Sequence, residues 1–204
     1  MSFARTHIAY KHQLSIVLCV FAVITFAEVA NAALDRALNI HGILPRSLDH
    51  WYGIALAPLL HGSTAHYGGN IVPLMLFSFL VMQHGIIRYF LLTLTVTLLG
   101  GLLVWIFARE ALHIGASGLL YGYFGFLLVP GFVSREFKLM LISAVVWFFY
   151  GGIVYGILPT VPQISFESHL FGFMVGALFG YQWGGVAVNN RPKPGHPHIP
   201  RKLL

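Results

Sequence analysis

The sequence predicts an all-α membrane protein: a bundle of six transmembrane helices around an intramembrane cavity that opens outward. The first reason is composition, because 57% of the residues are hydrophobic and only 9% are charged, whereas soluble domains average about 25% charged residues. The second is six apolar stretches, each long enough to cross about 30 Å of hydrocarbon. The third is that polar residues gather at the starts of three of these stretches. A soluble enzyme and a disordered protein are both excluded.

The six apolar stretches are joined by short loops, except for one longer connection at residues 35–60 that is too polar to span. They cover residues 14–34, 63–83, 89–108, 114–134, 139–157 and 167–188. Residues 14–188 are therefore expected to form one domain. Residues 1–13 are expected to be a cytoplasmic segment. Residues 189–204 contain four prolines and four basic residues and are expected to be a flexible cytoplasmic tail.

The basic residues orient the bundle. With the N-terminus inside, nine Lys and Arg residues fall on the inner side and only Arg36, Arg46 and Arg109 on the outer side. Cytoplasmic loops carry the excess of basic residues, so both termini are expected to be cytoplasmic. No long targeting presequence is visible, which favours a bacterial-type cytoplasmic (inner) membrane. The net charge of +6 is not gathered on one face, so the expected partner is the lipid bilayer and not nucleic acid.

The first stretch has a second interpretation. Arg5 and Lys11, the apolar residues after them and the small residues 30–32 resemble a signal peptide with its cleavage site. We favour a retained helix. Glu28, near its outer end, is interpreted as a carboxylate that snorkels or bonds to another helix, and not as a catalytic group.

Three polar clusters mark the place where chemistry is expected. They are residues 61–70 (HGSTAHYGGN), residues 115–118 (GASG) and residues 167–169 (ESH), at the starts of the second, fourth and sixth stretches. Even-numbered helices run from outside to inside, so all three clusters fall in the outer half of the membrane. Polar groups are tolerated at that depth where they line a water-filled cavity. The clusters therefore predict one shared site.

Ser117 is the candidate nucleophile. It lies between Gly115 and Gly118, where a helix begins, and the helix start offers unpaired N–H groups and a positive dipole beside it. That setting suits a nucleophile whose attack creates an oxyanion. The alternative is a small-residue packing motif between helices, and both interpretations stay open on these four residues alone.

His169 is the candidate general base, and a helix-capping histidine is the alternative. Glycines follow it at spacing four, at 172, 176 and 180, and form a smooth face that can approach the helix bearing Ser117 closely. Tyr121, one turn after Ser117, is expected to buttress the imidazole. Glu167 lies on roughly the opposite side of the helix from His169. The prediction is therefore a Ser-His dyad and not a triad with a carboxylate.

His66 and Asn70 lie one helical turn apart and are expected to donate hydrogen bonds to the oxyanion, together with the Ser117 N–H. His61 is expected to be structural and to bond loop carbonyls at the mouth of the cavity. A zinc site formed by His61, His66 and His169 is the main alternative. It is disfavoured because no H-E-x-x-H, thiolate or intramembrane carboxylate accompanies them. No metal or other cofactor is expected.

With these motifs the chain resembles the rhomboid intramembrane serine proteases over about residues 40–185. Residues 61–70 are similar to the family's H-x-x-x-x-H-x-x-x-N motif, residues 115–118 to its G-x-S-G motif, and His169 with the glycines after it to its sixth helix. Ser168 departs from the Gly or Ala often found before the histidine. Trp51 lies in the first loop without the adjacent arginine of some members.

The resemblance implies a protease that hydrolyses peptide bonds in or near the transmembrane helices of other membrane proteins. Carried over by position, Ser117 is the nucleophile, His169 the general base and acid, and His66 and Asn70 the oxyanion donors. Two other hypotheses remain. One is a non-catalytic relative that binds transmembrane helices and controls their trafficking or turnover. The other is a small transporter or metal permease, which no paired half-helix repeats support.

Overall fold

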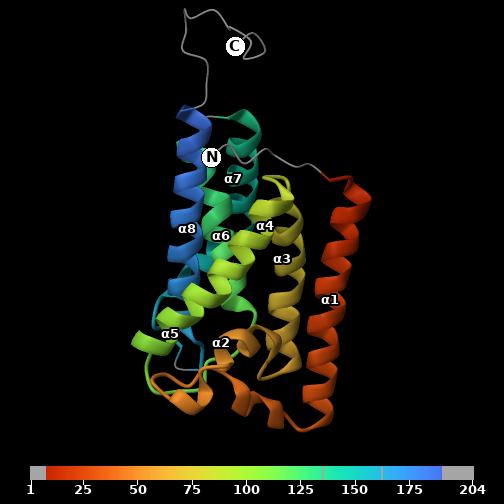
Figure 1. The fold of residues 1–204 in the computed structure, drawn as a ribbon, viewed down its shortest axis with the longest axis vertical. Coiled ribbons are helices and arrows are strands. Elements are labelled where there is room, and N and C mark those ends of the chain that lie inside the picture. The colour runs from red at the N-terminus through yellow and green to blue at the C-terminus, as the bar shows by residue number, and fades with distance from the viewer. Residues whose placement is uncertain (1–7, 135, 162, 190–204) are drawn as a thin grey trace, which may run out of the picture.

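The computed structural model describes residues 8–134, 136–161 and 163–189, and these residues form a helical bundle (Figure 1). Its long helices are α1 (Tyr10–Ala33), α3 (Thr64–Met82), α6 (Ser117–Val133), α7 (Phe137–Tyr150) and α8 (Phe166–Asn189). One further pass is built from α4 (Ile86–Thr95), the π-helical turn η4 (Val96–Gly100) and α5 (Gly101–Phe107). The short elements are η1 (Ala37–His41), η2 (Leu48–His50), α2 (Gly53–Leu56), η3 (Ala57–Leu59) and η5 (Gly151–Ile157).

Each of the six expected apolar stretches is helical, with ends within a few residues of the expected ones. Four helical passes, namely α1, α3, residues 86–107 and residues 137–157, are long and apolar enough to cross a membrane, and α6 is a shorter apolar helix. The chain is an all-α integral membrane protein. The expected terminal segments, residues 1–13 and 189–204, fall mostly outside the described residues, although α1 already begins at Tyr10.

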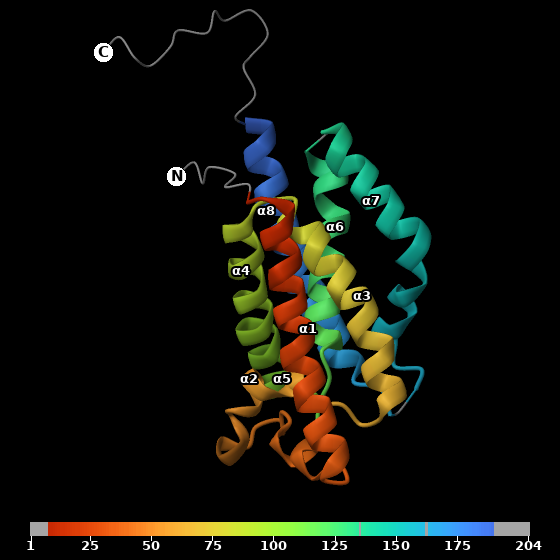
Figure 2. The same ribbon diagram turned by 90° about the vertical axis from the view of Figure 1, so that its right-hand side faces the viewer.

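Helix α6 lies at the centre of the bundle, between α7 and α8 and behind α3 (Figures 1 and 2). It is apolar on all sides, as expected of a helix that is buried in a protein core or spans a membrane. Phe124, Phe126 and Leu127 are accordingly completely buried. Helix α1 lies at the edge of the bundle, where it packs on α3. The central helix is therefore also the one that begins at the candidate nucleophile.

Glycines set the distance between α6 and α8. A Cβ atom at Gly172 would overlap the carbonyl oxygen of Gly118, and one at Gly176 would overlap that of Gly122. The two backbones are thus in direct contact, as the glycine spacing predicted. The π-helical turn packs against the same region, since a Cβ at Gly122 would lie 2.5 Å from Cγ1 of Val96. A side chain at Gly172 or Gly176 would force α6 and α8 apart.

The start of α1 and the end of α8 lie at one end of the bundle, and the chain between α1 and α3 wraps the other end (Figures 1 and 2). Helices α3, α6 and α8 all begin at that second end. The three polar clusters of the sequence therefore lie at one end of the molecule.

Candidate active site

Most of the predicted site residues line one cavity. It has a volume of about 770 Å³. Its lining includes His66, Asn70, Ser117, Tyr121 and His169. Loop residues that precede α3, α6 and α8 complete the wall at the end of the bundle. Side chains from three helices, far apart in the sequence, thus face one space.

Ser117 is the first residue of α6 and is only 4% exposed. The turn before it depends on Gly115, whose φ of +119° is strained for any residue with a Cβ. A Cβ there would also lie 2.8 Å from Nε2 of His66. Within the described part of the chain, the Ser117 hydroxyl makes no hydrogen bond to His169. Such bonds are often long before substrate binds.

The ring of His169 is held from two sides. Its Nδ1 lies 2.8 Å from the carbonyl oxygen of Gly156, in η5. A carbonyl can only accept, so Nδ1 carries the hydrogen and Nε2 of the neutral ring is left as a proton acceptor. The ring of Tyr121 stacks on the imidazole with centroids 4.1 Å apart and planes 6° apart. The tyrosine is fixed in turn, because its hydroxyl donates to the carbonyl of Ile153 at 2.5 Å.

No carboxylate orients His169 among the described residues. Glu167, two positions earlier, turns to Arg109, whose Nε lies 3.5 Å from Glu167 Oε1 and whose backbone N–H lies 3.4 Å from the same oxygen. The orienting acceptor is the Gly156 carbonyl, which the sequence analysis did not identify. Gly156 must be glycine, because a Cβ there would overlap the hydroxyl of Tyr121 and lie 3.1 Å from Nδ1 of His169.

His66 and Asn70 present N–H donors beside the turn that precedes Ser117. The backbone N–H of Gly62 donates to Nδ1 of His66 over 3.4 Å, which leaves the ring hydrogen on Nε2. Nδ2 of Asn70 is buried and has no hydrogen-bond partner among the described residues. Ser63 fixes this start of α3 as its N-cap, since its hydroxyl accepts from the His66 N–H at 3.1 Å. Unpaired buried donors are costly, so their presence indicates a site built to receive an acceptor.

Gly118 lies on the other side of Ser117, where α6 meets the start of α8. A Cβ at Gly118 would lie 3.4 Å from the backbone oxygen of Ser168. A second, small cavity of about 40 Å³ lies next to the first. Gly115, Gly118, Ser168 and Gly172 are among the residues that line it. Close approach and a positive φ therefore require glycine at position 115, whereas a Cβ at Gly118 would make an ordinary contact.

His61 differs from expectation. Its ring is completely buried, and its Nε2 accepts from the backbone N–H of Ala116 at 3.4 Å, so it bonds an N–H and not a loop carbonyl. Burial, with smaller contributions from nearby His66 and Arg36, lowers the pKa of His61 from 6.5 to about 4. The Glu28 carboxylate 3.9 Å from Nδ1 does not offset this. His61 is therefore neutral, as an acceptor nitrogen requires.

His113, which belongs to none of the three sequence clusters, is 1% exposed in the loop before α6. Its Nε2 lies 3.0 Å from the carbonyl oxygen of Arg109, which must accept, and its Nδ1 lies 2.6 Å from the hydroxyl of Ser165. The hydroxyl of Ser165 in turn forms a hydrogen bond with the hydroxyl of Ser168, with the two oxygens 2.6 Å apart. Burial lowers the pKa of His113, which keeps the ring neutral. These hydrogen bonds join the loop before Ser117 to the start of the helix that bears His169. No motif spacing predicts them.

The histidines are not grouped as metal ligands. Among the described residues, no three His, Cys, Asp or Glu side chains are placed to hold a metal ion. The ring nitrogens of His61 and His169 that form hydrogen bonds are directed at backbone groups of Ala116 and Gly156. That no cofactor is needed stays a prediction.

Comparisons with known proteins find matches over most of the chain. The family model described as the Rhomboid domain matches residues 48–185. An uncharacterized protein of Mycobacterium tuberculosis is 34% identical over 198 residues, which cover 90% of this chain and 82% of that protein. RHOMBOID-like protein 4 of Arabidopsis thaliana is 30% identical over 152 residues, 68% of this chain and 37% of that protein. No solved structure matches the chain.

Proposed function

The chain belongs to the rhomboid family, and from this premise we propose that it is an intramembrane serine endopeptidase. It cleaves peptide bonds in or near the transmembrane helices of other membrane proteins. The observation that carries the proposal is the shared cavity, in which a serine, a histidine with an unprotonated nitrogen and two N–H donors meet.

In the proposed reaction, Ser117 Oγ attacks the carbonyl carbon of the scissile bond while its proton passes to Nε2 of His169. The Gly156 carbonyl accepts the Nδ1–H bond at 2.8 Å throughout and stabilises the imidazolium. His169 then gives the proton to the leaving amine, and a covalent acyl-enzyme remains on Ser117. Water, activated by the same imidazole, attacks the ester and releases the second product.

Negative charge develops on the carbonyl oxygen during both attacks. Nε2–H of His66, Nδ2–H of Asn70 and the backbone N–H of Ser117 are the proposed donors to it. The His66 donor is held before substrate arrives, because the Gly62 N–H donates to its Nδ1 and Ser63 caps the start of α3. Loss of one preorganised donor typically lowers kcat by about 10²–10³-fold.

Substrates are proposed to be transmembrane proteins whose cleaved segment unwinds readily. A helix shields its carbonyl groups by internal hydrogen bonds, so a peptide bond must leave the helix before Ser117 can reach it. Glycine lowers helix stability by about 1 kcal/mol relative to alanine, which favours segments that contain it.

We further propose that both termini are cytoplasmic and that the cavity faces the outer side of a bacterial-type cytoplasmic membrane. The start of α1 and the end of α8 lie at the opposite end of the bundle from the starts of α3, α6 and α8 (Figure 2), whose residues line the cavity. The excess of Lys and Arg falls on the same side as the termini, which supports this orientation.

The test is cleavage of a model transmembrane substrate in proteoliposomes by the wild type, Ser117→Ala and His169→Ala. Ser15→Ala, an exposed serine on α1 that bonds only its own helix at Lys11, is the matched control. The wild type and Ser15→Ala should cleave, and the two site variants should be inactive. Equal cleavage by Ser117→Ala would overturn the proposal. A folded wild type that binds the substrate without cleaving it would instead favour a non-catalytic helix-binding protein.

A further inference from the structure

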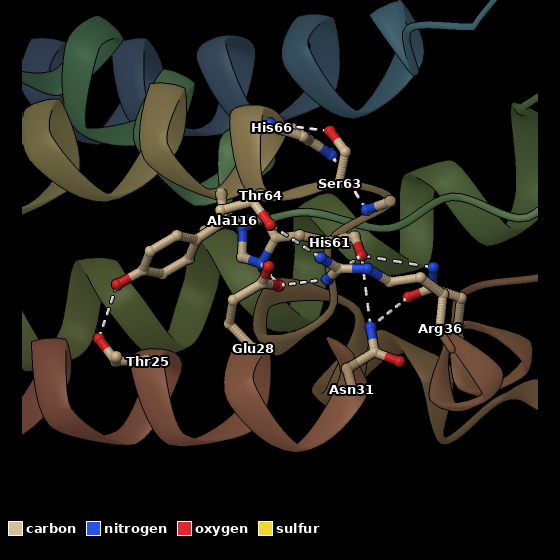
Figure 3. Close-up of polar contacts among 12 residues, drawn as sticks. Thr25, Glu28, Asn31, Arg36, His61, Ser63, Thr64, His66 and Ala116 are labelled. Carbon is tan, nitrogen blue, oxygen red and sulfur yellow. Dashed lines mark hydrogen bonds and ion pairs between the residues drawn. The ribbon is translucent and has the colours of Figure 1, made fainter. Parts of the chain in front are cut away.

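We propose that the ion pair of Glu28 and Arg36, at the end of α1, is a positioning element of the active site: it holds His61, and His61 holds the backbone turn before Ser117. Figure 3 shows these side chains together. The inference rests on the proposed protease function. None of these three residues lines the cavity, so they act through other groups.

The ion pair is short, with Glu28 buried and Arg36 partly exposed. Nη1 of Arg36 lies 2.7 Å from Oε2 of Glu28, and the two side chains are 23% and 6% exposed. Nη1 also donates to the carbonyl oxygen of His61 at 3.2 Å, and Nη2 to the hydroxyl of Thr64 at 3.2 Å. Arg36 therefore connects α1 with the residues that begin α3 (Figure 3).

The carbonyl of His61 accepts from two further side chains. Nδ2 of Asn31, a completely buried residue of α1, lies 3.3 Å from it, and Nδ2 of Asn39 lies 3.4 Å from it. With Arg36, three side chains from α1 and the segment after it converge on one backbone oxygen. The backbone position of His61 is thus set by α1 and the segment that follows it.

The ring of His61 is set by Glu28. Because Nε2 accepts from the Ala116 N–H, the ring hydrogen must lie on Nδ1. Nδ1 faces Oε2 of Glu28 at 3.9 Å and makes no hydrogen bond to another described residue. A carboxylate at this distance stabilises the tautomer with hydrogen on Nδ1, which is the tautomer that leaves Nε2 free to accept. The Glu28 carboxylate thus contacts the His61 imidazole, and the imidazole accepts from the N–H of Ala116, the residue before the nucleophile.

Two neighbours restrict the ring further. It packs edge-on against His66, with centroids 5.1 Å apart, and against Tyr67, with centroids 5.6 Å apart. The same imidazole thus contacts the turn before Ser117 and one of the proposed oxyanion donors. A rotation of His61 would displace both sides of the oxyanion site.

Stability alone does not account for this ion pair. Replacing a buried ion pair with apolar residues of similar volume is often neutral or stabilising, whereas a retained pair can specify one arrangement. Glu28 also lies in α1, a helix long and apolar enough to cross a membrane, where a carboxylate is costly and marks a functional region. The arrangement specified is the orientation of His61 towards Ala116.

The test measures kcat and KM for a model transmembrane substrate in proteoliposomes with the wild type, Glu28→Gln, His61→Gln and the double variant. Small misplacements at an active site lower the rate by up to about 10²-fold. We therefore expect Glu28→Gln to lower kcat about tenfold with KM unchanged within about twofold. Because Glu28 acts on the ring of His61 and, through Arg36, on its backbone carbonyl, adding Glu28→Gln to His61→Gln should lower kcat by less than Glu28→Gln lowers it in the wild type.

Gln13→Leu is the matched control. It removes the 2.7 Å hydrogen bond between Gln13 and Gln83, which also joins α1 to α3 but at the other end of the helix. It should leave kcat unchanged, and Glu28→Asp should recover part of the rate. If Glu28→Gln does not fold, Glu28→Gln/Arg36→Gln removes both charges together and should show the same loss of kcat.

A wild-type kcat in Glu28→Gln would overturn the inference. If Glu28→Gln does not fold, a wild-type kcat in Glu28→Gln/Arg36→Gln would do so. So would effects of Glu28→Gln and His61→Gln that multiply, or an equal kcat loss in Gln13→Leu. Failure of the proposed function is a different result: the wild type itself would then cleave no faster than Ser117→Ala.

Discussion

His169 donates its Nδ1 hydrogen to the carbonyl oxygen of Gly156 over 2.8 Å. In a Ser-His-Asp triad a carboxylate occupies this place, orients the ring and stabilises the imidazolium with a full charge. A backbone carbonyl orients the ring equally well but offers only a dipole. Tyr121, stacked on the ring, supplies the second restraint. The proposed base is therefore defined by backbone geometry in η5 and not by another ionisable side chain.

The first prediction concerns Gly156. Gly156→Ala should lower kcat by about 10²-fold, because the new Cβ displaces Tyr121 and the imidazole it supports. Gly152→Ala, in the same 3-10 turn, is the control, since a Cβ there meets nothing within 4 Å. Substrate cleavage by the two variants compares them directly. Equal activity would show that close packing at Gly156 does not set the positions of Tyr121 and His169.

The second prediction concerns the contact between α6 and α8. Gly176→Ala should lower the free energy of unfolding by about 1–3 kcal/mol, because the added methyl overlaps the Gly122 carbonyl and forces the backbones apart. Gly68→Ala on α3 has open space around its Cβ and should not destabilise the protein. Thermal unfolding in detergent measures both. A Gly176→Ala protein as stable as the wild type would contradict direct backbone packing.

The third prediction concerns the oxyanion donors. Asn70→Ala should lower kcat by about 10²–10³-fold and leave KM nearly unchanged, since the amide is needed only when charge develops on the substrate oxygen. Asn70→Asp keeps the shape but faces the oxyanion with an acceptor, so it should be at least as slow. The measurement is steady-state cleavage of a transmembrane substrate. A rise in KM with unchanged kcat would place Asn70 in substrate binding.

The fourth prediction concerns acid stability. The pKa of His61 falls from 6.5 to about 4 on folding, mainly because the ring is buried. The unfolded chain therefore binds the proton first as the pH falls. The stability that His61 contributes is complete above pH 6.5 and declines towards pH 4.

The comparison is between wild type and His61→Gln, unfolded thermally at pH 7.5 and pH 5. His61→Gln should lose less stability between the two pH values than the wild type loses. His113, whose pKa burial also lowers, leaves a residual dependence of the same sign in both proteins. An equal pH dependence would show that His61 is not buried as a neutral ring.

The helices and the meeting of the three clusters follow from side-chain patterns. Apolar length identifies the passes, and the glycines at 118, 172 and 176 permit the close approach that brings α6 to α8. Gly115 could be assigned to a special turn because it precedes a helix start. Each of these features depends on which residue types stand at neighbouring positions in the sequence, so a pattern can predict it.

The orienting groups could not be predicted in the same way. The acceptor for His169 is a backbone carbonyl, and every residue has one, so no residue type marks Gly156. His113 and Ser165 are 52 residues apart and meet only because the segments before α6 and α8 are brought together in the fold. Glu28 was expected to snorkel or to bond another helix, and its partner is Arg36, eight residues later, because the chain reverses after α1.

The most direct measurement of the central claim is labelling of the membrane-embedded protein by a fluorophosphonate, with the labelled residue identified by mass spectrometry. The account predicts that wild type is labelled on Ser117 and that His169→Ala and Ser117→Ala are not. Labelling of another residue, or equal labelling of wild type and His169→Ala, would contradict an activated serine that depends on this dyad.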